Sequence, residues 1–241
     1  MVHERQQLCT REALRQQLLD LGLGLARGGT QQLLRVGLGQ VRGQEDNPGQ
    51  VQLPQVRRAS DATARFTSGG SGFFVEPDCL VTCAHVISSK TRSIDFDKES
   101  IIVQGKEVPL AGAKIEFIKQ GYNEPDVAVI RFPQAVVGRD ETLKFALFPV
   151  ERNAAVFIVG HPQIIHEQQV FSWGRVSDAA RGFISTDAEG RNGNSGGPAL
   201  NERGEVVGMF TSSTTSNFSE SSALVASGRI RTVLNTPASG R

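Results

Sequence analysis

The chain has 241 residues, a formal net charge of +1 and 39% hydrophobic residues. A charge this close to zero gives no electrostatic reason to expect nucleic acid or an anionic membrane surface as a partner. The sequence contains no run of about 18 apolar residues, so we expect no membrane span. Its apolar content is sufficient for the core of one large domain or two small ones.

The N-terminal sequence MVHERQQLCTRE lacks the apolar stretch of a secretory signal. The three cysteines, Cys9, Cys79 and Cys83, are too few for a disulfide framework. Cys79 and Cys83 fall within one strand-like run, where four residues span about 13 Å, too far to bridge. We therefore expect an intracellular protein, cytoplasmic or organellar.

Residues 1–60 differ in composition from the rest of the chain. They are rich in Gln, Gly and Arg and contain no Lys. This bias predicts a low-complexity, largely disordered head. Leu8, Leu14, Leu18 and Leu21 lie close to helical spacing, which favours a short helix over residues 4–21; the same stretch could equally be a targeting segment.

From about residue 66 onward, short β-rich runs bounded by Gly, Pro, Asp or Asn follow one another. The predicted strands lie at 72–76, 79–83, 100–103, 113–119, 126–132, 154–160, 168–176, 182–186, 204–210 and 222–226. A hairpin turn is predicted at 201–204. Only the end looks helical, with Ser227 as N-cap and Ile230, Val233 and Leu234 on one face. The pattern indicates an all-β sandwich or barrel.

Residues 193–198 read GNSGGP and are the most informative segment of the chain. Glycines around Ser195 allow a tight turn that exposes its hydroxyl and leaves neighbouring backbone N–H groups free to point at a reacting carbonyl oxygen. An acyl-transfer nucleophile needs both the exposed hydroxyl and the free N–H groups. The alternative is a glycine-rich turn between two strands.

A serine nucleophile requires a base, and the chain has four histidines. His85 follows an apolar strand, which places it where its ring can face a cleft; the alternative is a hydrogen-bonded core histidine. Asp126 opens an apolar strand after Pro125, so its carboxylate is carried toward the core, where a histidine partner would offset the cost of burial. Its alternative is a turn-capping role after proline.

The order His85, Asp126, Ser195 is that of the chymotrypsin-type triad. The chain resembles trypsin-like serine peptidases of the chymotrypsin superfamily, and within them the HtrA/Deg branch. The resemblance covers about residues 66–235. It is carried by GSGFFV at 70–75, TCAHV at 82–86, DVAV at 126–129, VGHP at 159–162, GRV at 174–176, FISTDA at 183–188 and GEVVG at 204–208.

The resemblance implies a protease domain at 61–241 made of two packed six-stranded antiparallel β-barrels, at about 66–140 and 145–235, with a short C-terminal helix. It places His85 and Asp126 on the first barrel and Ser195 on the second, and it makes the N–H groups of Gly193 and Ser195 the oxyanion hole. It implies a serine endopeptidase that forms an acyl-enzyme, acts on polypeptides in protein quality control, and needs no cofactor or metal. A homotrimer is a further hypothesis.

Three residues depart from family patterns. Asn194 replaces the aspartate of digestive enzymes, as in the HtrA branch, so we expect no activation by zymogen cleavage. Cys83 and His161 stand where HtrA sequences commonly have asparagine. The chain also ends too soon after its last hairpin for a PDZ module, so we expect substrate recognition and regulation within the protease domain or the head.

The resemblance assigns Glu189, Phe210 and Thr211 to the substrate pocket. Glu189 lies six residues before Ser195, where an acidic pocket base would favour a basic residue before the scissile bond. The adjacent loop resembles HtrA instead, whose members tend to prefer small aliphatic residues, and Arg191 could neutralise Glu189. Both preferences stay open, because loop conformation determines such a pocket.

Two other functions are compatible with the sequence. The first is a catalytically silent protein with the trypsin fold that binds other chains, in a chaperone-like way, because a fold alone does not establish activity. The second is a zinc site made of Cys79, Cys83, His161 and His166, whose spacings are loose for structural zinc. Core thiols and surface histidines explain these four residues more simply.

Overall fold

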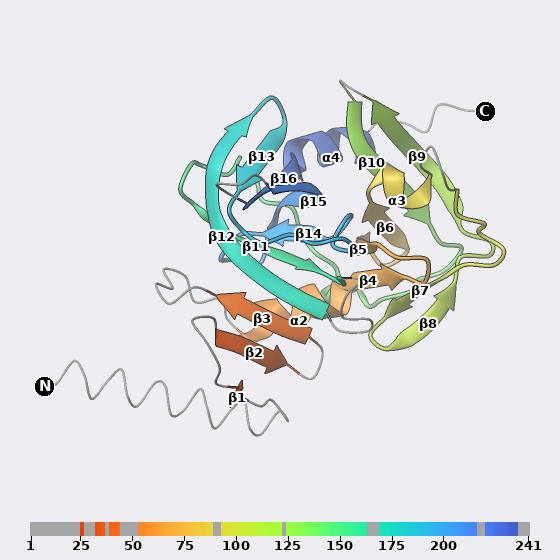
Figure 1. Cartoon of the computed structure of the whole chain (residues 1–241). Helices are drawn as coiled ribbons and strands as arrows, with labels where there is room; N and C mark the ends of the chain where they lie inside the picture. The colour runs from red at the N-terminus through yellow and green to blue at the C-terminus, as the bar shows by residue number, and fades with distance from the viewer. Residues whose placement is uncertain are drawn as a thin grey trace, which may run out of the picture.

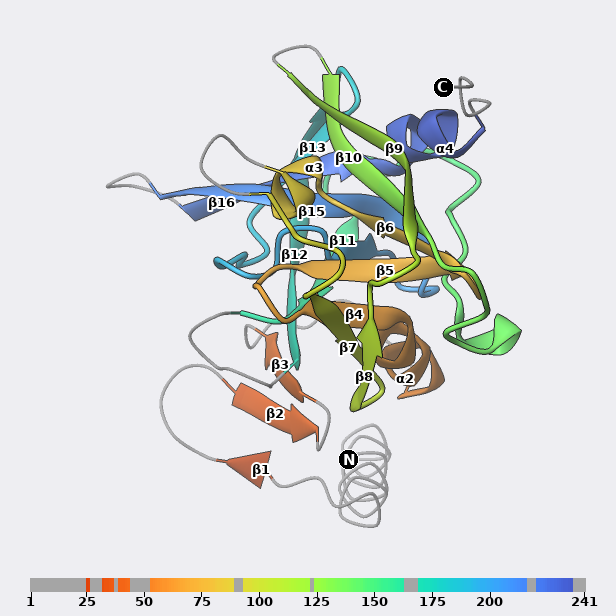
Figure 2. The ribbon, with the colours of Figure 1, turned by 90° about the vertical axis from the view of Figure 1, so that its right-hand side faces the viewer.

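The structure is a computed structural model that describes residues 25–26, 32–36, 39–43, 53–88, 93–121, 124–162, 169–215 and 220–235. Two curved β-sheets pack against each other, and short helices lie at their margins (Figures 1 and 2). No helix within these ranges is both long and apolar enough to cross a membrane. Of the predicted site residues, Asp126 lies on a strand of the first sheet, His85 on a short helix that follows another of its strands, and Ser195 in a loop of the second sheet.

The first sheet has seven strands in the order β8-β7-β4-β5-β6-β10-β9. Their bounds are β4 (Thr63–Phe66), β5 (Ser71–Glu76), β6 (Cys79–Thr82), β7 (Ser100–Val103), β8 (Lys106–Pro109), β9 (Lys114–Gly121) and β10 (Glu124–Arg131). A buried hydrophobic cluster that includes Phe66, Phe74, Leu80 and Ile130 packs between its strands.

The prediction that the first sheet is a closed barrel of six strands is wrong, because the described sheet has seven strands and is open. Within the described part of the chain no pairing joins β8 to β9, so the sheet curls without closing. The extra strand arises because the turn at Gln104 and Gly105, both with positive φ, folds β7 back onto β8 as a tight hairpin.

The second sheet contains the predicted six-stranded barrel. Its strands are β11 (Ala155–Gly160), β12 (Gln169–Ala180), β13 (Phe183–Thr186), β14 (Pro198–Leu200), β15 (Val206–Thr215) and β16 (Glu220–Ala226). The ring closes because the long β12 pairs with β11 along its first half and with β13 along its second. The 201–204 hairpin turn between β14 and β15 is confirmed by the Gly204 N–H donating to the Asn201 carbonyl at 2.9 Å.

The described residues include four helical segments beside the sheets: α2 (Leu53–Ala62), α3 (Ala84–Ile87), the 3-10 turn η1 (Arg139–Glu141) and α4 (Ser227–Leu234). The predicted C-terminal helix is present as α4, and Ile230 and Val233 are buried against the sheets. The prediction of Ser227 as its N-cap is wrong. Strand pairing continues to Ala226, which therefore takes the extended cap position, and Ser227 is already helical.

The described part of the segment before residue 60 contains regular secondary structure. It holds β1 (Leu25–Ala26), β2 (Gln32–Val36), β3 (Gly39–Gly43) and most of α2. Strand β3 runs parallel to the start of β12, with Gly39 opposite Gln169, on the edge that β13 leaves uncovered. Covering an exposed strand edge is a tertiary effect that composition does not disclose. The helix predicted at 4–21 lies outside the described residues.

Candidate active site

Strand pairing brings His85 and Asp126 together. β6 and β10 are neighbours with Thr82 opposite Ala128, so the turn after β6 and the start of β10 lie at the same end of the sheet. A register irregularity between β9 and β10 falls at Asp126, which leaves it outside the regular ladder and free to point at α3. The His85 Nδ1 lies 2.5 Å from the Asp126 Oδ2, and the His85 backbone N–H donates to the Oδ1 at 3.0 Å.

These contacts determine the ionisation of Asp126. Burial raises its pKa, but the hydrogen bonds from His85 and Thr211 and the charge of the imidazole outweigh burial and hold the pKa below its ordinary value. The carboxylate is therefore ionised at neutral pH. It accepts a hydrogen bond from the His85 Nδ1–H, which leaves Nε2 as the ring nitrogen that faces away from Asp126 and can accept a proton from the nucleophile.

Thr211, on β15, contacts both ends of this arrangement. Its hydroxyl donates to the Asp126 Oδ2 at 2.8 Å, and its carbonyl accepts a hydrogen bond from the Ser195 Oγ at 3.3 Å. Thr211 was expected only in the substrate pocket, and its contact with Asp126 was not predicted. No sequence signal revealed it, since 85 residues separate the two.

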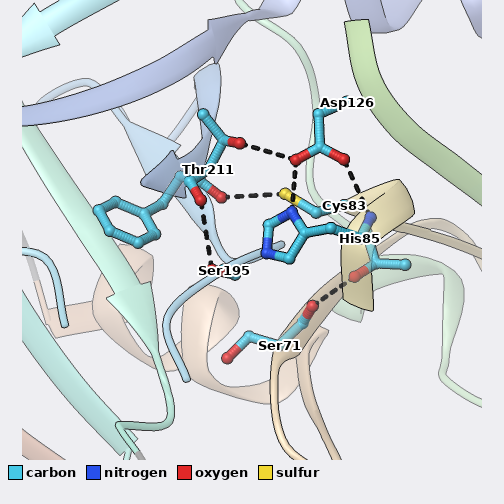
Figure 3. Close-up of polar contacts among 8 residues, drawn as sticks. Ser71, Cys83, His85, Asp126, Ser195 and Thr211 are labelled. Carbon is cyan, nitrogen blue, oxygen red and sulfur yellow. Dashed lines mark hydrogen bonds and ion pairs between the residues drawn. The ribbon is translucent and has the colours of Figure 1, made fainter. Parts of the chain in front are cut away.

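Ser195 lies in the loop between β13 and β14, on the side of the imidazole away from Asp126 (Figure 3). Its hydroxyl is bonded to the Thr211 carbonyl and, among the described residues, makes no hydrogen bond to His85. Hydrogen bonds between nucleophile and base are often long or absent before substrate binds. The structure thus brings all three predicted residues to one place, with the Ser195–His85 bond unmade.

The loop also presents two unoccupied donors. The N–H groups of Asn194, Gly196 and Gly197 donate to backbone carbonyls, whereas those of Gly193 and Ser195 have no partner in the part of the chain that the structure describes. Gly193 has a φ of +100°, a conformation that favours glycine. This pair of N–H groups is the one predicted to form the oxyanion hole.

Cys83 lies beside this group, fully buried, and its thiol donates to the Phe210 carbonyl at 3.2 Å. Burial raises its pKa well above the ordinary value, and the Asp126 charge adds to the effect. Within the described ranges, Cys83, His85 and Asp126 form the one cluster of metal-ligating side chains. Cys79 and His161 do not join it, and His166 lies outside the described residues, so the structure does not assemble the alternative zinc site.

The residues assigned to the substrate pocket lie beside the nucleophile loop. The Arg191 Nε donates to the Glu189 Oε1 at 2.6 Å, and a second guanidinium nitrogen contacts the same oxygen. The Phe210 ring is buried and packs on Gly190, where a Cβ would lie 1.8 Å from the ring. The Glu189 charge is therefore paired, and an aromatic ring occupies the space next to it.

The comparisons with known proteins identify the class to which this fold and site belong. Residues 70–209 match the model of the trypsin-like peptidase domain, which is more than half of the chain. The chain belongs to this family. The match includes His85, Asp126 and Ser195.

Among curated proteins the chain is similar to members of the HtrA group. It is 32% identical to serine protease HTRA1 of Xenopus laevis over 63% of this chain, and 30% identical to serine protease HTRA4 of Mus musculus over 70%. The matched part spans about a third of the length of these relatives, 33% and 34% respectively.

Solved structures show the same fold. The active form of the Rv3671c protease from M. tuberculosis matches with a TM-score of 0.64 and 20% identity, covering 88% of this chain and 93% of that one. A serine endoprotease from Yersinia pestis matches with a TM-score of 0.62 and 21% identity, covering 78% and 66%. The predicted all-β, chymotrypsin-like fold is thereby confirmed.

Proposed function

We propose that the chain is a serine endopeptidase that hydrolyses peptide bonds through His85, Asp126 and Ser195. The observation that carries the proposal is the His85–Asp126 pair, held by two hydrogen bonds, beside a serine whose loop offers two unoccupied N–H groups. Each element of an acyl-transfer site is therefore present in the described part of the chain.

In this mechanism the Ser195 hydroxyl shifts its hydrogen bond from the Thr211 carbonyl to His85 Nε2 when substrate binds. Its oxygen attacks the scissile carbonyl carbon while Nε2 takes the proton, and the Asp126 carboxylate stabilises the imidazolium that forms. The Gly193 and Ser195 N–H groups bind the oxyanion. His85 then gives its proton to the leaving amine, and a water activated by the same nitrogen hydrolyses the acyl-enzyme.

Small aliphatic residues are the proposed preference before the scissile bond. Pairing with Arg191 supports this preference over a basic one, because the Glu189 carboxylate already has a cationic partner. The buried Phe210 ring against Gly190 also favours a short apolar side chain.

Labelling with a fluorophosphonate tests the catalytic proposal. We expect the wild-type protein to label at Ser195 and to cleave members of a peptide library, and we expect Ser195→Ala to do neither. A correctly folded wild type that fails to label or cleave would instead support the catalytically silent binding protein. The cleaved peptides also report the preferred residue before the scissile bond.

We further propose an intracellular role in protein quality control, performed by a homotrimer. The quality-control role and the trimer rest on the resemblance to the HtrA group, and the two buried free thiols, Cys79 and Cys83, support a reducing compartment. Light scattering of the purified protein tests the trimer, since a monomeric mass would reject it. Cell fractionation tests the compartment.

A further inference from the structure

Ser71, the first residue of β5, connects the two sheets at the nucleophile loop. It is completely buried, and each of its polar atoms is hydrogen-bonded. The backbone N–H donates to the Ser195 carbonyl at 2.8 Å, and the hydroxyl donates to the Gly193 carbonyl at 2.7 Å. The hydroxyl also accepts the His161 N–H at 3.0 Å (Figure 3 shows Ser71 beside the site).

The two carbonyls that Ser71 binds lie on either side of one oxyanion donor. The Gly193 carbonyl belongs to the peptide unit between residues 193 and 194, which separates the Gly193 N–H from the Ser195 N–H along the chain. The Ser195 carbonyl belongs to the peptide unit between residues 195 and 196. The unit between residues 194 and 195, which carries the Ser195 N–H, lies between these two units. Since each peptide unit is planar and only the φ and ψ angles between units are free, the hydrogen bonds from Ser71 to the two outer units limit rotation of the middle one.

The orientation of the Gly193 carbonyl matters for a second reason. Glycine at a φ of +100° has little intrinsic barrier to other conformations, so residue 193 does not by itself keep the loop in one form. The hydrogen bond from Ser71 holds the negative end of the carbonyl dipole toward β5. A carbonyl that rotated toward the site would repel the developing oxyanion.

Ser71 is itself held by the strand that leads to His85. The Thr82 hydroxyl donates to the Ser71 carbonyl at 2.6 Å, and β5 pairs with β6, which ends three residues before His85. The loop packs tightly on this contact, since a Cβ at Gly196 would lie 2.0 Å from the Ser71 carbonyl oxygen. The base and the oxyanion donors are thus aligned through the same pair of strands.

We propose that Ser71 is a positioning residue for the oxyanion hole, whose hydroxyl fixes the Gly193 peptide and so aims the Gly193 and Ser195 N–H groups. This inference rests on the proposed peptidase function. Ser71 touches no reacting atom and acts through the nucleophile loop. Its loss is expected to weaken transition-state binding more than substrate binding, because the oxyanion exists only after attack.

The test compares Ser71→Ala with wild type on one peptide substrate and on a peptide boronic acid, which forms a tetrahedral adduct with the nucleophile. We expect kcat to fall about 10- to 100-fold, less than complete loss of a donor, with KM changed less than about 3-fold. The boronic acid should bind more weakly by about the factor lost in kcat/KM. Ser71→Thr, which keeps the hydroxyl, should recover most of kcat.

Thr63→Val is the matched control, because it removes another buried hydroxyl–carbonyl bond, from Thr63 to Ala59 at 2.6 Å, away from the site. It should lower stability about as much as Ser71→Ala and leave the kinetics unchanged. Equal kinetic losses in the two variants, or a Ser71→Ala defect confined to KM, would overturn the inference.

Ser71→Cys keeps a weaker donor of similar size and supplies the comparison if Ser71→Ala does not fold. It should have an intermediate kcat, and full activity would contradict the proposal. A wild type that neither labels with fluorophosphonate nor cleaves peptide rejects the proposed function itself. An active wild type with an equally active Ser71→Ala rejects only the role of Ser71.

Discussion

Thr211 donates its hydroxyl hydrogen to the carboxylate of Asp126 at 2.8 Å, across the boundary between the barrel and the open sheet. The carbonyl of Thr211 also accepts the hydrogen bond of Ser195. One residue of the barrel thereby contacts both the acid that orients the histidine and the proposed nucleophile.

Thr211→Val should reduce activity through Asp126. The substitution removes a hydrogen bond to an ionised group, so the Asp126 pKa should rise toward its ordinary value and the His85 ring should be less firmly held. We expect kcat to fall about 10-fold, with little change in KM. Steady-state kinetics over a range of pH measure the effect. Thr211→Ser keeps the hydroxyl and should retain most activity, and a Ser variant as impaired as Val would contradict the explanation.

Arg191→Ala should shift cleavage preference toward basic residues. Arg191 pairs with the Glu189 carboxylate, and its removal takes a positive charge away from beside the proposed substrate pocket, so that the pocket becomes more negative. We expect the ratio of kcat/KM for Lys or Arg against Ala or Val before the scissile bond to rise about 10-fold. Matched fluorogenic peptides provide the measurement. The double variant Glu189→Gln with Arg191→Ala is the control, and a shift that persists there would exclude Glu189 as its cause.

His161 should make the fold sensitive to mild acid. Burial, with a smaller contribution from the charge of Arg65, lowers its pKa from 6.5 to about 4. Above pH 6.5 the ring is neutral in the folded and the unfolded chain. Between about pH 6.5 and 4 the unfolded chain binds the proton first, so the free energy of unfolding should fall by about 3 kcal/mol across this window.

Urea denaturation at several pH values measures this loss. His161→Asn should flatten the pH dependence between about pH 6.5 and 4 while it leaves stability at pH 8 less affected. His161 contributes its backbone N–H to the Ser71 hydroxyl, and that contact survives the substitution. An unchanged slope in the variant would show that other groups cause the acid sensitivity.

Cys79 and Cys83 should resist alkylation in the folded protein. Burial raises the pKa of Cys79 from 9.0 to about 12, and the pKa of Cys83 is also raised well above 9.0. The thiolate fraction of Cys79 at pH 8 should therefore be roughly 10³-fold lower than that of a free thiol. Iodoacetamide labelling followed by peptide mass mapping measures each site separately. Rapid labelling of either thiol in native protein, relative to the urea-unfolded chain, would contradict this burial.

Local patterns in the sequence were sufficient to predict many of the strands. Ten predicted β-rich runs coincide with strands, because turn residues bound each run and alternation follows from the period of a strand. The short strands at 63–66, 106–109 and 198–200 were missed, since so few residues carry little periodicity. The open form of the first sheet and the pairing of β3 with β12 depend on contacts distant in sequence.

The sequence by itself predicted the family, which the comparisons confirm, and the nucleophile loop with the candidate triad His85, Asp126 and Ser195. These inferences rest on short motifs whose glycines and polar residues act over a few positions. Only the tertiary structure revealed that Thr211 contacts Asp126, that Arg191 pairs with Glu189, and that Ser71 holds the nucleophile loop. Long-range register and packing bring such pairs together, and the residue types involved are common enough that no local pattern distinguishes them.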